Sequence, residues 1–264
     1  MIYYFSGTGN SLAVAQSIAA ETGQKISNRP IATPEGSTDE VAGFVCPVYA
    51  WGIPRHFKGI IREWMRMIST KEIAKPEYIF MVLTCGDDIG MTDREMSRLL
   101  KEGGHNLDAC FSIAMPNTYV CLPGFDIDPA DLQQHKLQTT KGRIREIVGH
   151  INQRKRGLTD VVRGTVPRLK SYVLRPLFNT FLTGDKHFLA TNECIGCGLC
   201  QRICPLQNIT SSSAGKPQWN GNCADCLRCY HLCPKHAIHY AGRTHTKGQY
   251  HHMVLDEKPR STTR

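Results

Sequence analysis

The first part of the chain alternates short apolar runs with amphipathic segments. Apolar runs of strand length lie at residues 2–5, 25–27, 41–48, 78–84 and 107–115. Helices are predicted between and after them, at residues 11–20, 56–68, 92–101 and 129–154. The clearest helix signal is in residues 56–68, where apolar side chains follow the i, i+3, i+4, i+7 spacing of one helix face. This alternation predicts an α/β domain, with a doubly wound parallel sheet of five strands that helices cover on both faces.

Pattern and composition divide the chain into four parts. At 264 residues it is longer than a single domain of about 150 residues, so we expect two domains. We predict the α/β domain at residues 1–156, a basic amphipathic linker at 157–185, a small α+β cysteine-rich domain at 186–240 and a polar C-terminal tail at 241–264.

The linker interleaves basic side chains such as Arg163, Arg168 and Arg175 with apolar ones such as Val173 and Phe181. One short amphipathic helix is predicted there. Two interpretations remain open for it: a surface that meets a membrane or a partner protein, and a packed connector with one solvated face.

The start of the chain and its many cysteines indicate in which cellular compartment the protein is expected. No run of about 18 apolar residues is present that could span a bilayer. The chain opens directly on its first strand, without the basic and apolar regions of a signal peptide, so we expect a cytoplasmic protein. In that reducing compartment eight closely spaced cysteines of the 12 are expected to ligate metal rather than to form disulfides.

Eight of the cysteines form two copies of one motif, C-x2-C-x2-C-x3-C-P. The first copy ends in Cys204-Pro205 and the second in Cys233-Pro234. The close spacing lets three thiolates surround one corner of an iron–sulfur cubane, and Gly196 and Gly198 let backbone N–H groups approach the sulfurs. The candidate ligands are Cys194, Cys197, Cys200, Cys204, Cys223, Cys226, Cys229 and Cys233.

Residues 186–240 resemble the bacterial dicluster ferredoxins, and no ligand position departs from their pattern. The resemblance implies two 4Fe-4S clusters with crossed ligation, in which the fourth cysteine of each run binds the other cluster. Cys233 then completes the site of Cys194, Cys197 and Cys200, and Cys204 completes the other. Structural zinc is the alternative, because paired C-x2-C units also make four-cysteine zinc sites. The remaining thiols, Cys46, Cys85, Cys110 and Cys121, are predicted to be buried and inert.

A glycine- and hydroxyl-rich loop joins the first strand to the first helix. Glycines permit close backbone approach there, and hydroxyls and helix N–H groups can hold a phosphate. The candidate phosphate-binding residues are Ser6, Thr8, Gly9, Asn10 and Ser11. The Walker A lysine is absent.

Two further loops follow the third and fourth strands. The first contains Tyr49, Trp51 and Gly52, whose aromatic rings could stack on a flavin, and the second contains Gly86 and Asp87. In parallel sheets of this kind, ligands bind where the strand order reverses, at the carboxyl ends of the strands. The three loops are expected to meet at that edge.

The first loop resembles the phosphate loop of flavodoxins, and the whole chain resembles flavodoxin–ferredoxin fusion proteins. The resemblance implies a flavodoxin-like fold, with FMN bordered by the three loops. One position departs from it: Gly90 stands where flavodoxins have a tyrosine that covers the flavin. Stacking is then one-sided or supplied by Tyr119.

The expected function is electron transfer between two 4Fe-4S clusters and FMN, because FMN exchanges one or two electrons and each cluster carries one. The expected partners are redox proteins, including a low-potential donor, with peripheral membrane contact as a weaker alternative. A second hypothesis is a reductase of a small, quinone-like acceptor, with Tyr119, His56 or Cys121 as proton donor. No residue is assigned a catalytic role.

Nucleic acid is not an expected partner. The formal charge of +9 falls to about +3 once two clusters and an FMN phosphate are counted. No helix-turn-helix signature is present either, which disfavours a DNA-binding sensor.

Overall fold

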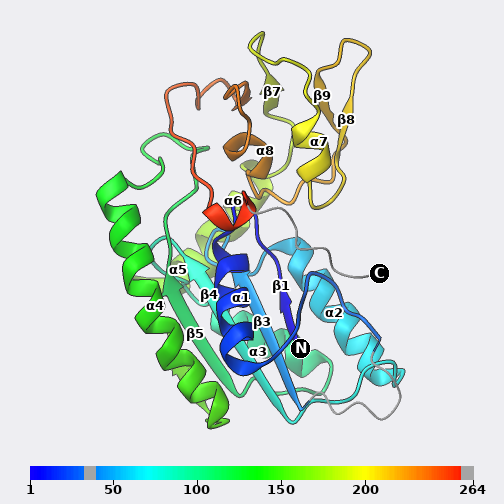
Figure 1. The fold of residues 1–264 in the computed structure, drawn as a ribbon, viewed down its shortest axis with the longest axis vertical. Coiled ribbons are helices and arrows are strands. Elements are labelled where there is room, and N and C mark those ends of the chain that lie inside the picture. The colour runs from blue at the N-terminus through cyan, green and yellow to red at the C-terminus, as the bar shows by residue number, and fades with distance from the viewer. Residues whose placement is uncertain (33–39, 257–264) are drawn as a thin grey trace.

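The computed structural model describes residues 1–32 and 40–256 (Figure 1). Its N-terminal part is a six-stranded parallel sheet with strand order β2-β1-β3-β4-β5-β6. The strands are β1 (Ile2–Tyr4), β2 (Ile26–Ser27), β3 (Val41–Pro47), β4 (Tyr78–Cys85), β5 (Ala109–Ala114) and β6 (Leu158–Asp160). All pairings in this sheet are parallel, so the carboxyl ends of the strands meet at one edge.

The expectation of five strands was wrong by one. The sixth strand, β6, pairs with β5 and extends the sheet beyond the expected boundary at residue 156. Its three residues are too few and too polar to form an apolar run. Arg143 holds the strand in place, because its guanidinium donates to the Asp160 carboxylate at 2.6 Å and to the Asp160 carbonyl at 3.0 Å.

Four helices cover the sheet, as expected, two on each face. They are α1 (Asn10–Thr22), α2 (Arg55–Ser69), α3 (Thr92–Glu102) and α4 (Ala130–Asn152). Ile18 of α1 and Ile147 of α4 lie in one core cluster, and Trp64 of α2 and Leu99 of α3 lie in the other. Every residue of β4 is buried, as expected for a strand covered on both faces.

The cysteine-rich part is a small α+β unit above the carboxyl ends of the parallel strands (Figure 1). Strand β7 (Phe188–Ala190) pairs antiparallel with β10 (Ile238–Tyr240), and β8 (Ile209–Ser211) with β9 (Pro217–Trp219). Short helices α7 (Leu199–Ile203) and α8 (Arg228–His231) follow the cysteine loops. Val120 and Cys121, from the connection between β5 and α4, share its core.

The expected linker contains more helix than predicted. After β6 it forms a continuous helical stretch of α5 (Pro167–Leu169), the π-helix η1 (Lys170–Leu174) and α6 (Arg175–Phe181). The stretch is anchored to the α/β part, since the Ser171 hydroxyl donates to the Trp51 carbonyl at 3.0 Å. No helix of the described residues is long and apolar enough to cross a membrane.

The C-terminal segment is not a free polar tail. Residues 241–256 pack against both parts of the molecule and end in the short helix η2 (Met253–Leu255). The Lys247 ammonium donates to the carbonyls of Val120, Leu122 and Phe125 at 2.5–2.7 Å. The Tyr250 hydroxyl donates to Asn10 Oδ1 at 2.9 Å. Residues 257–264 of the expected tail lie outside the described residues.

Candidate metal centres and the adjoining loops

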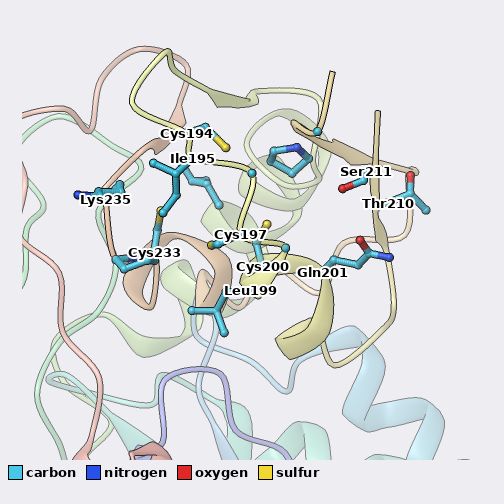
Figure 2. A pocket seen from close by; sticks show the side chains of 16 residues that line it. Cys194, Ile195, Cys197, Leu199, Cys200, Gln201, Thr210, Ser211, Cys233 and Lys235 are labelled. Atoms are coloured by element: carbon cyan, nitrogen blue, oxygen red, sulfur yellow. The ribbon is translucent and has the colours of Figure 1, made fainter. Parts of the chain in front are cut away.

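Four cysteines from both runs line one cavity in the cysteine-rich part. They are Cys194, Cys197, Cys200 and Cys233 (Figure 2). The first three come from the loop before α7 and its first turn, whereas Cys233 follows α8. The structure therefore gathers three thiols of the first run with the fourth thiol of the second run. This grouping is the one that crossed ligation expects.

The other four candidate ligands, Cys204, Cys223, Cys226 and Cys229, form the second group that crossed ligation expects. The pKa of the Cys226 thiol is raised to about 11, mainly by burial. A hydrogen bond from the Arg228 N–H and the charge of Arg228 lower this pKa, whereas the Cys204 thiol raises it. Burial also raises the pKa of the Cys229 thiol, and the thiols of Cys226, Cys223 and Cys200 add to that rise. Thiols of the two runs therefore interact electrostatically. Such buried thiols ionise readily only beside positive charge, which cluster irons supply.

The backbone repeats itself between the two runs, at an offset of 29 positions set by Cys194 and Cys223. Three pairs of equivalent residues have left-handed φ angles between 49° and 68°: Gly196 and Asp225, Gly198 and Leu227, Gln207 and His236. Two equivalent N–H groups, of Asn208 and Ala237, donate to Cys204 Sγ and Cys233 Sγ, both at 3.3 Å. Hydrogen bonds to cluster sulfurs are among the factors that set the reduction potential.

The thiols of each group do not converge on a single point. In the part of the chain that the structure describes, no group of three or more His, Cys, Asp or Glu side chains is arranged to hold one metal ion. In a cubane each thiolate binds a different iron, so convergence on one ion is not what a 4Fe-4S cluster requires.

Arg228 links the second cysteine group to the first N-terminal loop. Its Nε donates to the Gly7 carbonyl at 2.7 Å, and its Nη1 donates to the Ile203 carbonyl at 3.4 Å. A Cβ at Gly7 would lie 2.6 Å from the Cys226 carbonyl, so only glycine allows this approach. Arg228 was not among the site residues expected from the sequence. Its signal is a difference between the runs, because the equivalent residue of the first run is Leu199.

Three polar side chains of the first loop, those of Ser6, Asn10 and Ser11, are hydrogen-bonded within the protein. Ser6 Oγ accepts from the Gly9 N–H at 3.1 Å, Ser11 Oγ lies 2.7 Å from Thr84 Oγ1, and Asn10 Nδ2 donates to the Pro116 carbonyl at 3.0 Å. The N–H groups of Asn10 and Ser11, at the start of α1, make no hydrogen bond within the described residues. Free N–H groups at a helix N-terminus suit a phosphate, so the donor set of this loop fits one.

The C-terminal segment covers the same loop, although the sequence predicted only a polar tail there. The His252 N–H donates to the Thr8 carbonyl at 2.8 Å. Gly9 has a φ of 100°, and a Cβ there would lie 2.9 Å from His252 Cβ. The loop therefore lies between the cysteine-rich part and the C-terminal segment.

The second and third loops lie beside the helical stretch after β6. Tyr49 and Gly52 exchange backbone hydrogen bonds at 3.0 and 3.1 Å, which closes a tight turn around Trp51. The Lys170 ammonium lies 5.6 Å from the Trp51 ring, and the Arg175 guanidinium packs against Gly52. In the third loop, Gly86 lies against the Asn117 side chain and Asp87 is exposed.

The position that departs from the flavodoxin pattern is enclosed. A Cβ at Gly90 would lie 2.5 Å from Ser171 Oγ and 2.8 Å from Trp51 Cβ. The glycine thus makes room for the helical stretch to pack on Trp51.

Two of the three candidate proton donors, Tyr119 and Cys121, belong to one cluster, and His56 lies apart from them. Tyr119 packs with Phe125 and Phe178, with ring centroids 5.6 and 5.7 Å away. Cys121 belongs to the core of the cysteine-rich part. His56 lies against Phe5 at 5.5 Å, and its burial lowers its pKa. Tyr119 therefore lies in the core shared with the cysteine-rich part, and no common proton-transfer site follows from these three residues.

A family model for the 4Fe-4S dicluster domain matches residues 193–238. No curated protein and no solved structure matches the chain. The matched stretch contains both cysteine runs and both cysteine groups described above. The C-terminal part is therefore a ferredoxin-type 4Fe-4S dicluster domain, joined to an α/β part with a parallel sheet, and it indicates iron–sulfur electron transfer.

Proposed function

We propose that this protein transfers electrons between two 4Fe-4S clusters and an FMN held by a flavodoxin-like N-terminal domain. The clusters carry one electron each and FMN exchanges one or two, so together they connect one-electron and two-electron chemistry. Redox partner proteins deliver and remove the electrons. In this proposal the flavodoxin-like domain includes β6, and the helical stretch after it joins the two domains.

Sheet topology supports the FMN part of the proposal. The strand order β2-β1-β3-β4-β5 is the doubly wound order in which ligands bind between β1 and β3. The first loop follows β1, and the second follows β3. Both belong to the edge at which the ferredoxin-type domain also lies (Figure 1).

The contact between the two domains carries the proposal. Cys226 and Arg228 of the second cysteine group touch Gly7 of the first loop directly. A cluster held by Cys204, Cys223, Cys226 and Cys229 is then the nearer one to the FMN. The cluster held by Cys194, Cys197, Cys200 and Cys233 is the outer one, where a partner protein exchanges electrons.

The chain's own residues have distinct roles in this proposal. The N–H groups of the first loop bind the phosphate, with Ser6, Thr8, Gly9, Asn10 and Ser11 forming the loop. The positive charge of Arg228 beside Gly7 favours an anion there. The second and third loops border the ring through Tyr49, Trp51, Gly52, Gly86 and Asp87.

The test replaces Arg228 with leucine, the residue at the equivalent position of the first run. FMN is titrated into the protein with reconstituted clusters, and binding is followed by flavin fluorescence. We expect wild type to bind one FMN per chain, and Arg228→Leu to bind about tenfold more weakly because a charge-assisted contact is lost. Stopped-flow absorbance is expected to show slower oxidation of the reduced clusters by bound FMN.

Arg62→Leu is the matched control, because Arg62 is an exposed arginine of α2 away from the loops. It should bind FMN as wild type does, and both variants should keep their iron and sulfide. FMN is also added to the wild-type protein at about 100-fold its expected working concentration. If no FMN binds even then, the flavin part of the proposal is contradicted, whatever the cluster content of the protein.

A further inference from the structure

The helical stretch after β6 carries an apolar stripe on its outer side. Leu169, Val173, Leu177 and Phe181 follow one another at spacings of four residues, which places them along one helix face, and Val166 immediately precedes α5 at the end of this stripe. All five are exposed, with fractions from 47% for Leu169 to 69% for Phe181. Contiguous exposed apolar side chains of this kind mark an interaction surface.

The inner side of the same stretch is polar, the reverse of an ordinary surface helix. Lys170 Nζ pairs with Asp88 Oδ2 at 2.5 Å, and Arg175 Nη1 pairs with Glu95 Oε2 at 2.6 Å. Ser171 Oγ accepts from the Met91 N–H at 2.8 Å. The stretch is therefore held by polar contacts, and its apolar side chains are left for another surface.

A basic groove lies directly beside the stripe. It has a volume of about 990 Å³, and Arg94, Arg98, Lys101, Arg163 and Arg168 line it together with Val166 and Leu169 of the stripe. No acidic residue lines it. Arg163 pairs with Asp93 at 2.5 Å, whereas Arg98, Lys101 and Arg168 form no ion pair within the described residues. The groove thus keeps an excess of positive charge.

We propose that the stripe and the groove together dock this protein on the surface of a membrane that contains anionic lipids. Apolar side chains enter the boundary between headgroups and acyl chains, and the neighbouring cations meet the lipid phosphates. The contact is peripheral, consistent with the finding that no described helix is long and apolar enough to cross a bilayer.

Charge argues against a second copy of the chain as the occupant. A two-fold symmetric dimer buries the same patch on both copies. It would therefore bring Arg98, Lys101 and Arg168 of one copy towards the same residues of the other, without acidic side chains in the groove to offset them. An anionic membrane presents the opposite charge over the whole surface.

The test measures co-sedimentation of the cluster-loaded protein with lipid vesicles. One vesicle type is pure phosphatidylcholine and the other contains about 30 mol% phosphatidylglycerol. We expect the wild-type protein to pellet with the anionic vesicles and to bind neutral vesicles much more weakly. Added salt should release the protein from the anionic vesicles. The double variant Arg98→Glu/Lys101→Glu should bind at least about 30-fold more weakly.

The stripe has its own variant and control. Val173→Glu/Leu177→Glu should lose binding to anionic vesicles while keeping its cluster absorbance, because both side chains are exposed. Ile31→Glu changes an exposed apolar residue after β2, and Arg62→Glu reverses a charge on α2; both should bind as wild type does.

Three results overturn the proposal. They are wild-type protein that does not pellet with anionic vesicles, equal binding to both vesicle types, and a concentration-dependent dimer in sedimentation velocity that Val173→Glu/Leu177→Glu abolishes. The last would assign the stripe to a second copy of the chain. None of them bears on FMN binding, which the titration above tests separately.

Discussion

The cysteine side chains could be identified from the sequence because ligand spacing is local. Each run places its thiols within a few residues, and the cysteine-lined cavity takes three of its four thiols from one such short loop. Arg228, Tyr250 and His252 could not be identified, because their contacts join residues far apart in the chain. The bond from Arg228 to Gly7 spans 221 positions, and the bond from Tyr250 to Asn10 spans 240.

Crossed ligation predicts which cluster a single cysteine supports. Cys204→Ala should damage the cluster of Cys223, Cys226 and Cys229, because Cys204 interacts electrostatically with Cys226 and does not line the cavity of Cys194. Its paramagnetic spectrum in the reduced state should then match that of Cys223→Ala. Cys121→Ala is the control, because this buried thiol lies outside both groups.

A match between the spectra of Cys204→Ala and Cys194→Ala would instead mean that each run holds its own cluster. The cavity lined by Cys233 and the first three cysteines would then not be a ligand set.

Residues with left-handed backbone angles in the cysteine loops should limit which substitutions the loops tolerate. Gly198 has a φ of 68°, where a Cβ costs about 1–2 kcal/mol. We expect Gly198→Ala to lower the denaturant midpoint at which cluster absorbance is lost. Gly198→Asn is the matched comparison and should be milder, because asparagine adopts left-handed angles more readily. Equal midpoints for wild type and Gly198→Ala would show that the loop is not constrained at this residue.

The long helices and strands of the α/β part could be predicted from the spacing of apolar residues, whereas the short elements could not. Residues 56–68 were expected to be helical and α2 spans Arg55–Ser69. Strand β6 has only three residues and depends on Arg143, which is 17 positions from Asp160. Residues 157–185 were expected to form a basic amphipathic linker with one short helix, because basic side chains are interleaved with apolar ones there. In the structure the apolar side chains of the helical stretch face outwards, and polar ones such as Lys170 and Arg175 face the domain.

The docking of this stretch on α3 predicts a pH-dependent effect. Burial raises the pKa of Glu95. The charge and hydrogen bond of Arg175, and the hydrogen bonds from Lys58 and the Ile53 N–H, outweigh this effect, so the pKa lies below the usual 4.5. The carboxylate therefore stabilises the fold above the unfolded-state pKa, and this stability is lost as the pH falls through the folded-state pKa.

Glu95→Gln should accordingly reduce the free energy of unfolding at pH 7 by about 1–2 kcal/mol. The difference from wild type should narrow as the pH falls below 4.5, the usual pKa. Urea unfolding followed by the fluorescence of buried Trp64 measures both. Glu63→Gln, an exposed carboxylate of α2, should leave the midpoint essentially unchanged. A difference that grows towards low pH would contradict this account of the Glu95 ion pair.

The arrangement of the whole molecule follows from contacts that no local pattern encodes. The α/β part and the dicluster part could each be predicted, because each has its own periodicity or motif. Their relative position depends on the β5–α4 connection, which shares the core of the dicluster part, and on residues 241–256, which bind both parts. That position brings the second cysteine group to the first loop, on which the proposed electron path depends.

The most direct test of the account is the cofactor content of the protein purified without oxygen. Iron, acid-labile sulfide, zinc and flavin are measured per chain on the same sample. We predict about eight iron, about eight sulfide and one FMN per chain, with little zinc. Zinc without sulfide would contradict the assignment of the eight cysteines to iron–sulfur clusters, and full iron and sulfide without any flavin would contradict the proposed flavodoxin-like role of the N-terminal domain.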